Sequence, residues 1–197
     1  MRHAALAVVL ATFLLPARAD AHLVTTGLGP VYDGIGHLLT TPEDLVPALA
    51  LALYAGLRGP RAGRRALFLL PPAWLLGGLV GLRSPMTIAF PLAAISFLVL
   101  GILVALDLPL PVWAVAAIAI AIGLAHGFLN GAALAGADSG VLGLIGIAVA
   151  LFVVVALAAA LVVALERPWK RIAARVAGSW IAAVGLLLLG WRLRGAR

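Results

Sequence analysis

The chain has no cysteine and few charged side chains. Of its 197 residues, 11% are charged and seven are Asp or Glu. Without cysteine there is no disulfide, thiolate metal site or cysteine nucleophile, so any metal must be bound through nitrogen and oxygen. The low charge, together with a hydrophobic content of 64% and a mean hydropathy of +1.19, excludes a soluble domain. We therefore predict an all-α integral membrane protein.

The chain is nevertheless basic, with a formal net charge of +7. Its Arg and Lys residues fall in short clusters that flank apolar runs, as orientation signals of membrane proteins do. We predict the lipid bilayer as the surrounding medium and no nucleic-acid partner.

Residues 1–21 are typical of a secretory signal peptide. A basic start at Arg2 and His3 precedes an apolar core from Ala4 to Leu15, and Ala19-Asp20-Ala21 fits the cleavage rule. Cleavage would leave His22 as the first residue of the mature chain. The alternatives are a cut after Ala19 or an uncleaved first helix, although the apolar core is short for a span of about 20 residues.

The mature chain, residues 22–197, contains six apolar windows and no room for a soluble domain between them. We predict one polytopic helix bundle of about six transmembrane helices, at 44–58, 65–82, 86–106, 111–132, 141–165 and 176–191. Glycines in the second and fifth windows favour close helix contacts: Gly77, Gly78, Gly81, Gly140, Gly143 and Gly146. Pro71-Pro72 should kink or break the second helix.

Charge asymmetry predicts the orientation. A bacterial inner-membrane protein with its mature N-terminus outside would place two basic loops in the cytoplasm, in agreement with the positive-inside rule. These loops contain Arg58, Arg61, Arg64 and Arg65, and Arg167, Lys170, Arg171 and Arg175. Arg192, Arg194 and Arg197 would then lie outside, against the rule.

Two polar clusters stand out from the apolar background. His126 and Asn130 are spaced i and i+4, which places them on one face of the fourth span, and Gly127 and Gly131 would let another helix or an ion approach. The alternative is an interhelical hydrogen bond from His126 and a helix-end cap from Asn130. A divalent cation site would use the same two side chains.

The other cluster lies at the start of the first span. Thr41-Pro42-Glu43-Asp44 has the features of a helix start, with a threonine N-cap, a proline at the first position and two acids in the first turn. Capping leaves His37 unexplained, and an imidazole beside the carboxylates of Glu43 and Asp44 would suit a transition-metal cation.

Three further residues could help to capture a cation. An N-terminal His22 would offer both an α-amine and an imidazole to one metal ion. Asp33 and Asp138 would add negative charge at the entrance, unless they are simply solvated loop acids.

These features together resemble the HupE/UreJ family, membrane proteins associated with hydrogenase and urease gene clusters and regarded as nickel or cobalt permeases or accessory proteins. The likeness lies in a signal peptide followed by histidine, a Gly-rich segment leading to His37, the acidic pair Glu43-Asp44, and His126-Gly127. In the family pattern a second histidine stands where this chain has Asp44, and another where it has Asn130. Both departures replace nitrogen with oxygen, which implies altered metal selectivity.

We therefore expect a secondary permease for a divalent metal, nickel or cobalt by resemblance, with metal ligands His22, His37, Glu43, Asp44, His126 and Asn130. The alternative is a non-transporting accessory or scaffold protein for metalloenzyme maturation, acting with a maturation partner or as a homo-oligomer. A membrane metal hydrolase is a third class, but the sequence has no HExxH or other catalytic motif. We expect no enzymatic activity and no resident cofactor.

Overall fold

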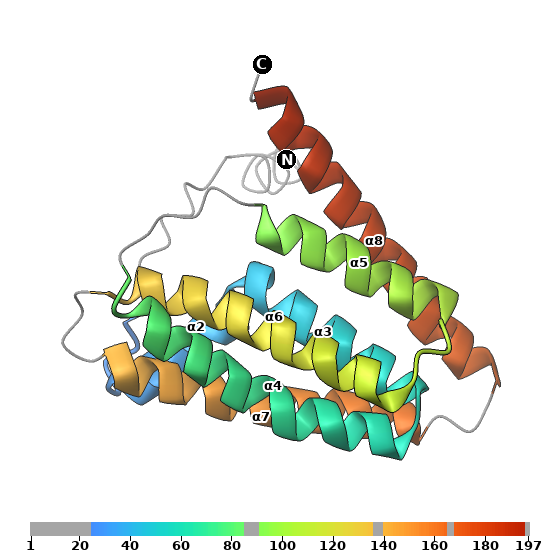
Figure 1. Cartoon of the computed structure of the whole chain (residues 1–197), viewed down its shortest axis with the longest axis horizontal. Helices are drawn as coiled ribbons and strands as arrows, with labels where there is room; N and C mark the ends of the chain where they lie inside the picture. Colours follow the sequence, from blue (N-terminus) through green and yellow to red (C-terminus); the bar gives the residue numbers. More distant parts are fainter. Residues whose placement is uncertain (1–24, 85–90, 136–139, 165–167, 196–197) are drawn as a thin grey trace, which may run out of the picture.

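The computed structural model describes residues 25–84, 91–135, 140–164 and 168–195. These residues form seven α-helices and no strand, which confirms the all-α helical bundle. In chain order the helices are α2 (Pro30–Thr40), α3 (Pro42–Leu57), α4 (Pro60–Gly81), α5 (Leu92–Leu106), α6 (Val112–Ala133), α7 (Gly140–Val163) and α8 (Pro168–Gly195) (Figure 1).

Each of the six predicted windows corresponds to one helix, from α3 to α8. The additional helix α2 occupies the Gly-rich segment before the first window and had no counterpart in the prediction. The predicted signal peptide and His22 lie outside the described residues.

Prolines mark the helix starts. Pro30, Pro42 and Pro60 each occupy the first turn of a helix, where a missing backbone N–H costs nothing. Gly29 and Gly59 precede two of them with φ angles of 105° and 100°, a conformation that side chains other than glycine rarely adopt.

Pro71 and Pro72 do not end α4, contrary to one expectation from the sequence. The helix continues through both residues to Gly81. Its neighbours α6 and α7 pack along it and hold the segment that contains the prolines. Prolines are tolerated in membrane helices when neighbouring elements compensate for the lost backbone hydrogen bonds.

Three described helices are long and apolar enough to cross a membrane: Val112–Ala133, Gly140–Val163 and Arg171–Arg194. Leu92–Leu106 is apolar but shorter. The 16 residues of α3 extend about 24 Å, less than the roughly 30 Å hydrocarbon core of a bilayer. A membrane protein is thus supported, whereas the count of six spans stays a prediction.

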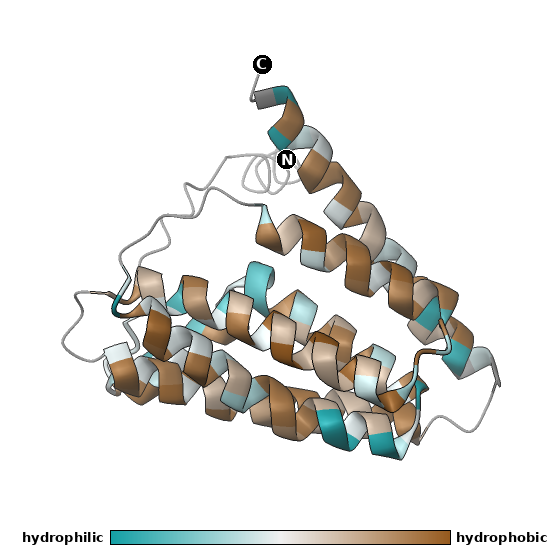
Figure 2. Cartoon of the chain, in the orientation of Figure 1, coloured by the Kyte–Doolittle hydropathy of each residue, from teal (hydrophilic) through white to brown (hydrophobic). Residues whose placement is uncertain are grey.

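Helix α3 is the centre of the bundle. It contacts each of the other six described helices, and its Ala48, Leu51 and Tyr54 are fully buried. Around it α4 packs along α6, α2 along α7 and α5 along α8 (Figure 1). Hydrophobic residues predominate along the helices, and hydrophilic ones gather near several helix ends (Figure 2).

Glycines allow the closest of these contacts, as the sequence predicts. A Cβ atom added to Gly127 of α6 would overlap the carbonyl oxygen of Trp74 in α4, and one added to Gly131 would overlap that of Gly78. Because the two backbones touch, α4 fixes the position of the α6 face that bears His126 and Asn130.

Candidate functional site

A buried carboxylate lies near the N-terminus of α3. Asp44 retains only 5% of its surface exposed, and it sits in the first helical turn after the N-cap residue Thr41. The Thr41 side chain makes no capping hydrogen bond. The Asp44 side chain points into the bundle, so helix capping does not account for it.

Two side chains of α6 bind this carboxylate. His126 Nδ1 lies 3.0 Å from Asp44 Oδ1, and Asn130 Nδ2 donates to Asp44 Oδ2 over 2.9 Å. Both contacts are buried, and they confirm that His126 and Asn130 share one face of the fourth predicted span. His126 thus makes the interhelical hydrogen bond of the alternative interpretation, whereas Asn130 bonds to another helix instead of capping its own.

Ser96 of α5 completes the surroundings of His126. Its Oγ lies 2.9 Å from His126 Nε2, and the serine is 2% exposed. Since an ionised Asp44 only accepts hydrogen bonds, a neutral His126 donates from Nδ1, and Nε2 accepts from the Ser96 hydroxyl. The network therefore selects one tautomer of the histidine.

Trp74 of α4 fixes the plane of the His126 ring. The two ring centroids are 5.3 Å apart, with an interplanar angle of 29°. Trp74 is fully buried, and its indole Nε1 has no hydrogen-bond partner among the described residues. Four helices, α3 to α6, thus contribute side chains to one polar centre.

His37 approaches the same carboxylate from α2. Its Nε2 lies 3.7 Å from Asp44 Oδ2, beyond hydrogen-bond distance, and its side chain is 18% exposed. It therefore lies between the buried centre and the surface of the bundle. We call His37, Asp44, Ser96, His126 and Asn130 the Asp44 cluster.

Not every predicted ligand joins this cluster. Glu43 is exposed and has no hydrogen bond or ion pair within the described part of the chain. It is adjacent to Asp44 on a helix, and a step of about 100° turns the two side chains to different faces. His22 and Asp138 lie outside the described residues.

Asp33, predicted as an entrance acid, is bound by its own chain. The hydroxyl and the backbone N–H of Thr26 donate to Asp33 Oδ1 over 2.7 and 2.6 Å. The hydrogen bond from the Thr26 hydroxyl has the larger effect and the one from the backbone N–H the smaller. Both lower the pKa of the Asp33 carboxyl below its ordinary value.

Sequence analysis missed Ser96 and Trp74. The only pattern that marks Ser96 is its place as a lone polar residue within the apolar stretch that forms α5. Trp74 had no distinguishing pattern, because an aromatic residue is ordinary in a membrane span.

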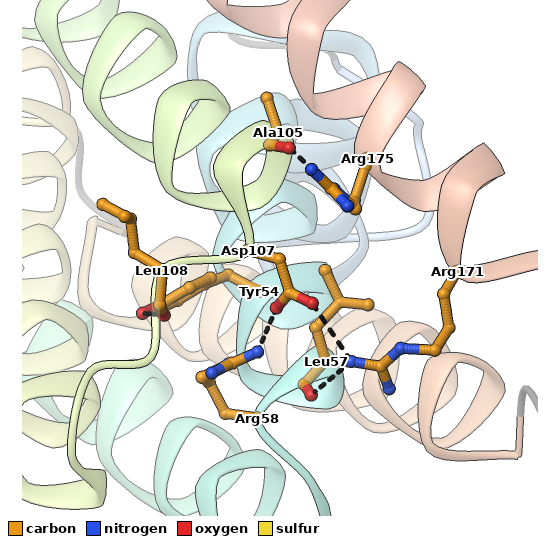
Figure 3. Close-up of polar contacts among 8 residues, drawn as sticks. All are labelled: Tyr54, Leu57, Arg58, Ala105, Asp107, Leu108, Arg171 and Arg175. Carbon is orange, nitrogen blue, oxygen red and sulfur yellow. Dashed lines mark hydrogen bonds and ion pairs between the residues drawn. The ribbon is translucent and has the colours of Figure 1, made fainter. Parts of the chain in front are cut away.

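A second charged centre lies at the opposite end of α3. Asp107, which ends α5 in a left-handed conformation with φ 50°, is bonded by Arg58 after α3 and by Arg171 of α8, the latter at 3.2 Å. Figure 3 shows the two guanidinium groups reaching the carboxylate from two sides. We call Asp107, Arg58 and Arg171 the Asp107 cluster.

Further hydrogen bonds tie the same end of the bundle together. Arg171 also donates to the Leu57 carbonyl over 3.2 Å, Tyr54 to the Leu108 carbonyl over 2.7 Å, and Arg175 to the Ala105 carbonyl over 2.9 Å (Figure 3). Arg58, Asp107 and Arg171 therefore lie at one end of the bundle, as the predicted topology requires of the three segments that bear them.

The Asp44 cluster has the donor types for a divalent transition metal but not the arrangement of a closed metal site. Over the residues that the structure describes, no three His, Asp or Glu side chains are placed to hold a metal ion together. The Asn130 Oδ1 oxygen is buried and has no hydrogen-bond partner there. It is an unused oxygen ligand beside a carboxylate and an imidazole.

The family model described as HupE / UreJ protein matches residues 10–188 of the chain. The chain belongs to the HupE/UreJ family. This membership places it among membrane proteins involved in nickel or cobalt handling for hydrogenase or urease. No curated protein and no solved structure matches it.

Proposed function

We propose that this HupE/UreJ protein is a secondary permease that carries a divalent transition-metal cation, nickel or cobalt, through the Asp44 cluster. It acts in a bacterial inner membrane with its mature N-terminus outside, and it catalyses no reaction. Family membership supports the membrane location and the class of metal.

The observation that supports this proposal most directly is the environment of the Asp44 carboxylate. Its partners are His37, His126 and Asn130, and no Arg or Lys of the described residues pairs with it. A carboxylate inside a membrane protein is costly unless its charge is balanced. A bound cation would supply the missing positive charge.

The spacing of the donors suits a metal after a small rearrangement. Two ligands at 2.0–2.2 Å from one metal are about 2.8–3.6 Å apart at ligand–metal–ligand angles of about 90–109°. The His37 Nε2 to Asp44 Oδ2 separation of 3.7 Å is slightly wider. If the Asn130 amide rotates, Nδ2 no longer donates to Asp44 and the free Oδ1 oxygen can bind the metal instead. If His126 loses its Nδ1 proton, Nδ1 gains a lone pair that can bind the metal.

The membrane potential can drive inward movement. A divalent cation gains about 4.6 kcal/mol per 100 mV when the inside is negative. The chain has no nucleotide-binding motif. On α3 the residues between the two clusters include the fully buried Ala48 and Leu51, so passage requires the helices to move.

A second function is favoured by the hydrogen bonds that Asp44 already accepts from His126 and Asn130. In that case the polar network serves packing, and the protein is a non-transporting accessory or scaffold for metalloenzyme maturation. The two functions differ in one respect: only the permease moves metal across the bilayer.

Uptake of radioactive nickel and cobalt by metal-starved cells tests the permease. We compare the wild type, His37→Ala, His126→Ala and Glu43→Gln at matched membrane levels. The expected result is a loss of uptake in both histidine variants and near-normal uptake in Glu43→Gln, because Glu43 is exposed and unpaired within the described residues. Wild-type uptake no higher than that of an empty vector would refute nickel and cobalt transport.

Rescue by external metal separates the two functions. In a host whose hydrogenase or urease depends on this protein, excess nickel in the medium restores enzyme activity if the missing step is transport. Activity that stays low despite restored cellular nickel would instead support the accessory role.

A further inference from the structure

Three exposed arginines lie near the start of α4. Arg61, Arg64 and Arg65 are exposed, and none of them makes a hydrogen bond or ion pair within the described residues. Their spacing of i, i+3 and i+4 places them on one side of the helix. They line a hollow whose remaining walls are Phe68, Leu69 and Val112. We call this the basic hollow.

An apolar groove between α4 and α7 begins beside the basic hollow. Its first section is lined by Gly63, Arg64 and Leu67 of α4, facing Ala156 and Ala159 of α7. Arg64 also lines the basic hollow, so the hollow and the groove are adjacent.

The second section of the groove shares Leu67 with the first and is lined only by apolar side chains. Its walls include Phe68, Pro71 and Leu75 of α4, and Ala148 and Phe152 of α7. The Phe68 and Phe152 rings meet edge to face with centroids 6.0 Å apart. The volume of this section is about 410 Å³. We call both sections together the α4–α7 groove.

The length of this groove corresponds to one bilayer leaflet. From Arg64 to Leu75 the helix rises about 16 Å at 1.5 Å per residue. Half of a hydrocarbon core of about 30 Å is about 15 Å. A phosphate held at the arginines would therefore place a fatty-acyl chain along the groove as far as the middle of the membrane.

We propose that the basic hollow and the α4–α7 groove together bind one anionic phospholipid. The guanidinium groups hold the phosphate of the headgroup, and one acyl chain lies in the groove against Leu67, Phe68 and Pro71. Arginine suits this role because its planar donors match phosphate oxygens.

Two other occupants fit the surface less well. A second copy of the chain, docked through the same face, would bring two sets of unpaired arginines together. A free phosphate ion would use the arginines but leave the adjoining apolar groove empty. The basic hollow and the groove match the two parts of a lipid, one charged and one apolar.

Native mass spectrometry of the purified full chain tests the proposal. The protein is titrated with phosphatidylglycerol or with phosphatidylcholine of identical acyl chains. Each basic residue near a headgroup raises affinity about fivefold, so three predict a preference for phosphatidylglycerol of up to about 100-fold. Arg61→Gln, Arg64→Gln and Arg65→Gln together should abolish this preference. Arg192→Gln with Arg194→Gln, which removes charge at the far end of α8, should retain it.

The groove is tested separately. Ala148→Phe should weaken phosphatidylglycerol binding by filling the apolar section, whereas Leu157→Phe, at a position 68% exposed on the same helix, should not. Circular dichroism must show equal helicity in both variants. If Ala148→Phe misfolds, the wild type is titrated instead with short-chain phosphatidylglycerol, which should bind weakly because its acyl chains do not fill the groove.

The following results would overturn the proposal. They are equal binding of both lipids by the wild type, an unchanged preference in the triple arginine variant, and a lipid-independent dimer that Ala148→Phe dissociates. The last would assign the groove to a second copy of the chain. Inorganic phosphate that displaces the lipid completely would show a headgroup-only site, which also contradicts the proposal.

Discussion

Two aspartates, one near each end of α3, are paired with different kinds of side chain. Asp44 lies in the first turn of α3 and meets an imidazole, an amide and a second imidazole at 3.0, 2.9 and 3.7 Å. Asp107 lies beyond the last turn and meets two guanidinium groups. Asp44 is buried and Asp107 is partly buried, yet only Asp107 has permanent positive partners in the described part of the chain.

This difference separates a structural carboxylate from a carboxylate that can exchange its partner. Arginine stays charged at all relevant pH values, so Asp107 is neutralised permanently, and a cation would have to displace a guanidinium group. The neighbours of Asp44 are neutral or titratable, and they also offer nitrogen and oxygen lone pairs. A metal can therefore compete at Asp44 without leaving a buried charge behind.

The largest difference between the two centres should appear when each carboxylate becomes an amide. We expect Asp44→Asn to reduce nickel or cobalt uptake by at least about 10-fold, as loss of a ligand or of its hydrogen-bond partner does at metal sites. Uptake is measured in metal-starved cells with radioactive metal at matched protein levels. The paired variant Asp107→Asn should keep its uptake per folded molecule. Equal losses in the two variants would remove the functional distinction between the clusters.

Gly127 tests whether the geometry of the Asp44 cluster depends on the close approach of α4 and α6. A Cβ at Gly127 would overlap the Trp74 carbonyl oxygen, so Gly127→Ala must push α4 and α6 apart and move Trp74 from the His126 ring. We expect a loss of unfolding free energy of about 1–3 kcal/mol, typical of overpacking. Thermal unfolding in detergent measures it.

The matched control for this experiment is Gly190→Ala in α8, where an added Cβ meets nothing within 4 Å. The free energy of unfolding should rise by up to about 1 kcal/mol, because alanine has a higher helix propensity than glycine. If the two variants unfold at the same temperature, the close contact is not what holds the Asp44 cluster in place.

Much of this architecture could be predicted from the sequence, because it depends on local patterns. Apolar windows of near-spanning length predicted helices α3 to α8, and an i, i+4 spacing placed His126 and Asn130 on one face. Glycines in the spans predicted close contacts, which occur at Gly127 and Gly131. These inferences need only helix geometry and the chemistry of each residue.

The rest depends on packing between distant segments. Helix α2 contains Gly34 and Gly36, which disfavour an isolated helix, and it is stabilised by contact with α7. Which of Glu43 and Asp44 enters the bundle is decided by the rotation of α3 against its neighbours. Ser96 joins the cluster because α5 packs against α3, a contact that no local pattern in α5 indicates.

The Asp107 cluster should prove mainly structural. Asp107→Asn leaves Arg58 and Arg171 near each other without their shared counterion, and we expect the free energy of unfolding to fall by about 1 kcal/mol, since the pair is partly exposed. Thermal unfolding of the purified chain at low and high salt measures this loss. High salt should reduce the difference from wild type, and an unchanged stability at low salt would show that the cluster contributes nothing.

We expect the smallest effect at Asp33, which is only partly buried and whose partners are neutral. The two hydrogen bonds from Thr26 lower the pKa of its carboxyl in the folded state. Its ionised form therefore stabilises the fold above the unfolded pKa of about 3.9, and this contribution is lost as the pH falls through the folded pKa. Thermal unfolding of the wild type and Asp33→Asn should differ slightly at pH 7, and the difference should shrink as the pH falls through the folded pKa. A difference that stays constant as the pH is lowered from 7 would assign the effect to the changed side chain rather than to its charge, and it would set the scale against which the Asp44 and Asp107 variants are judged.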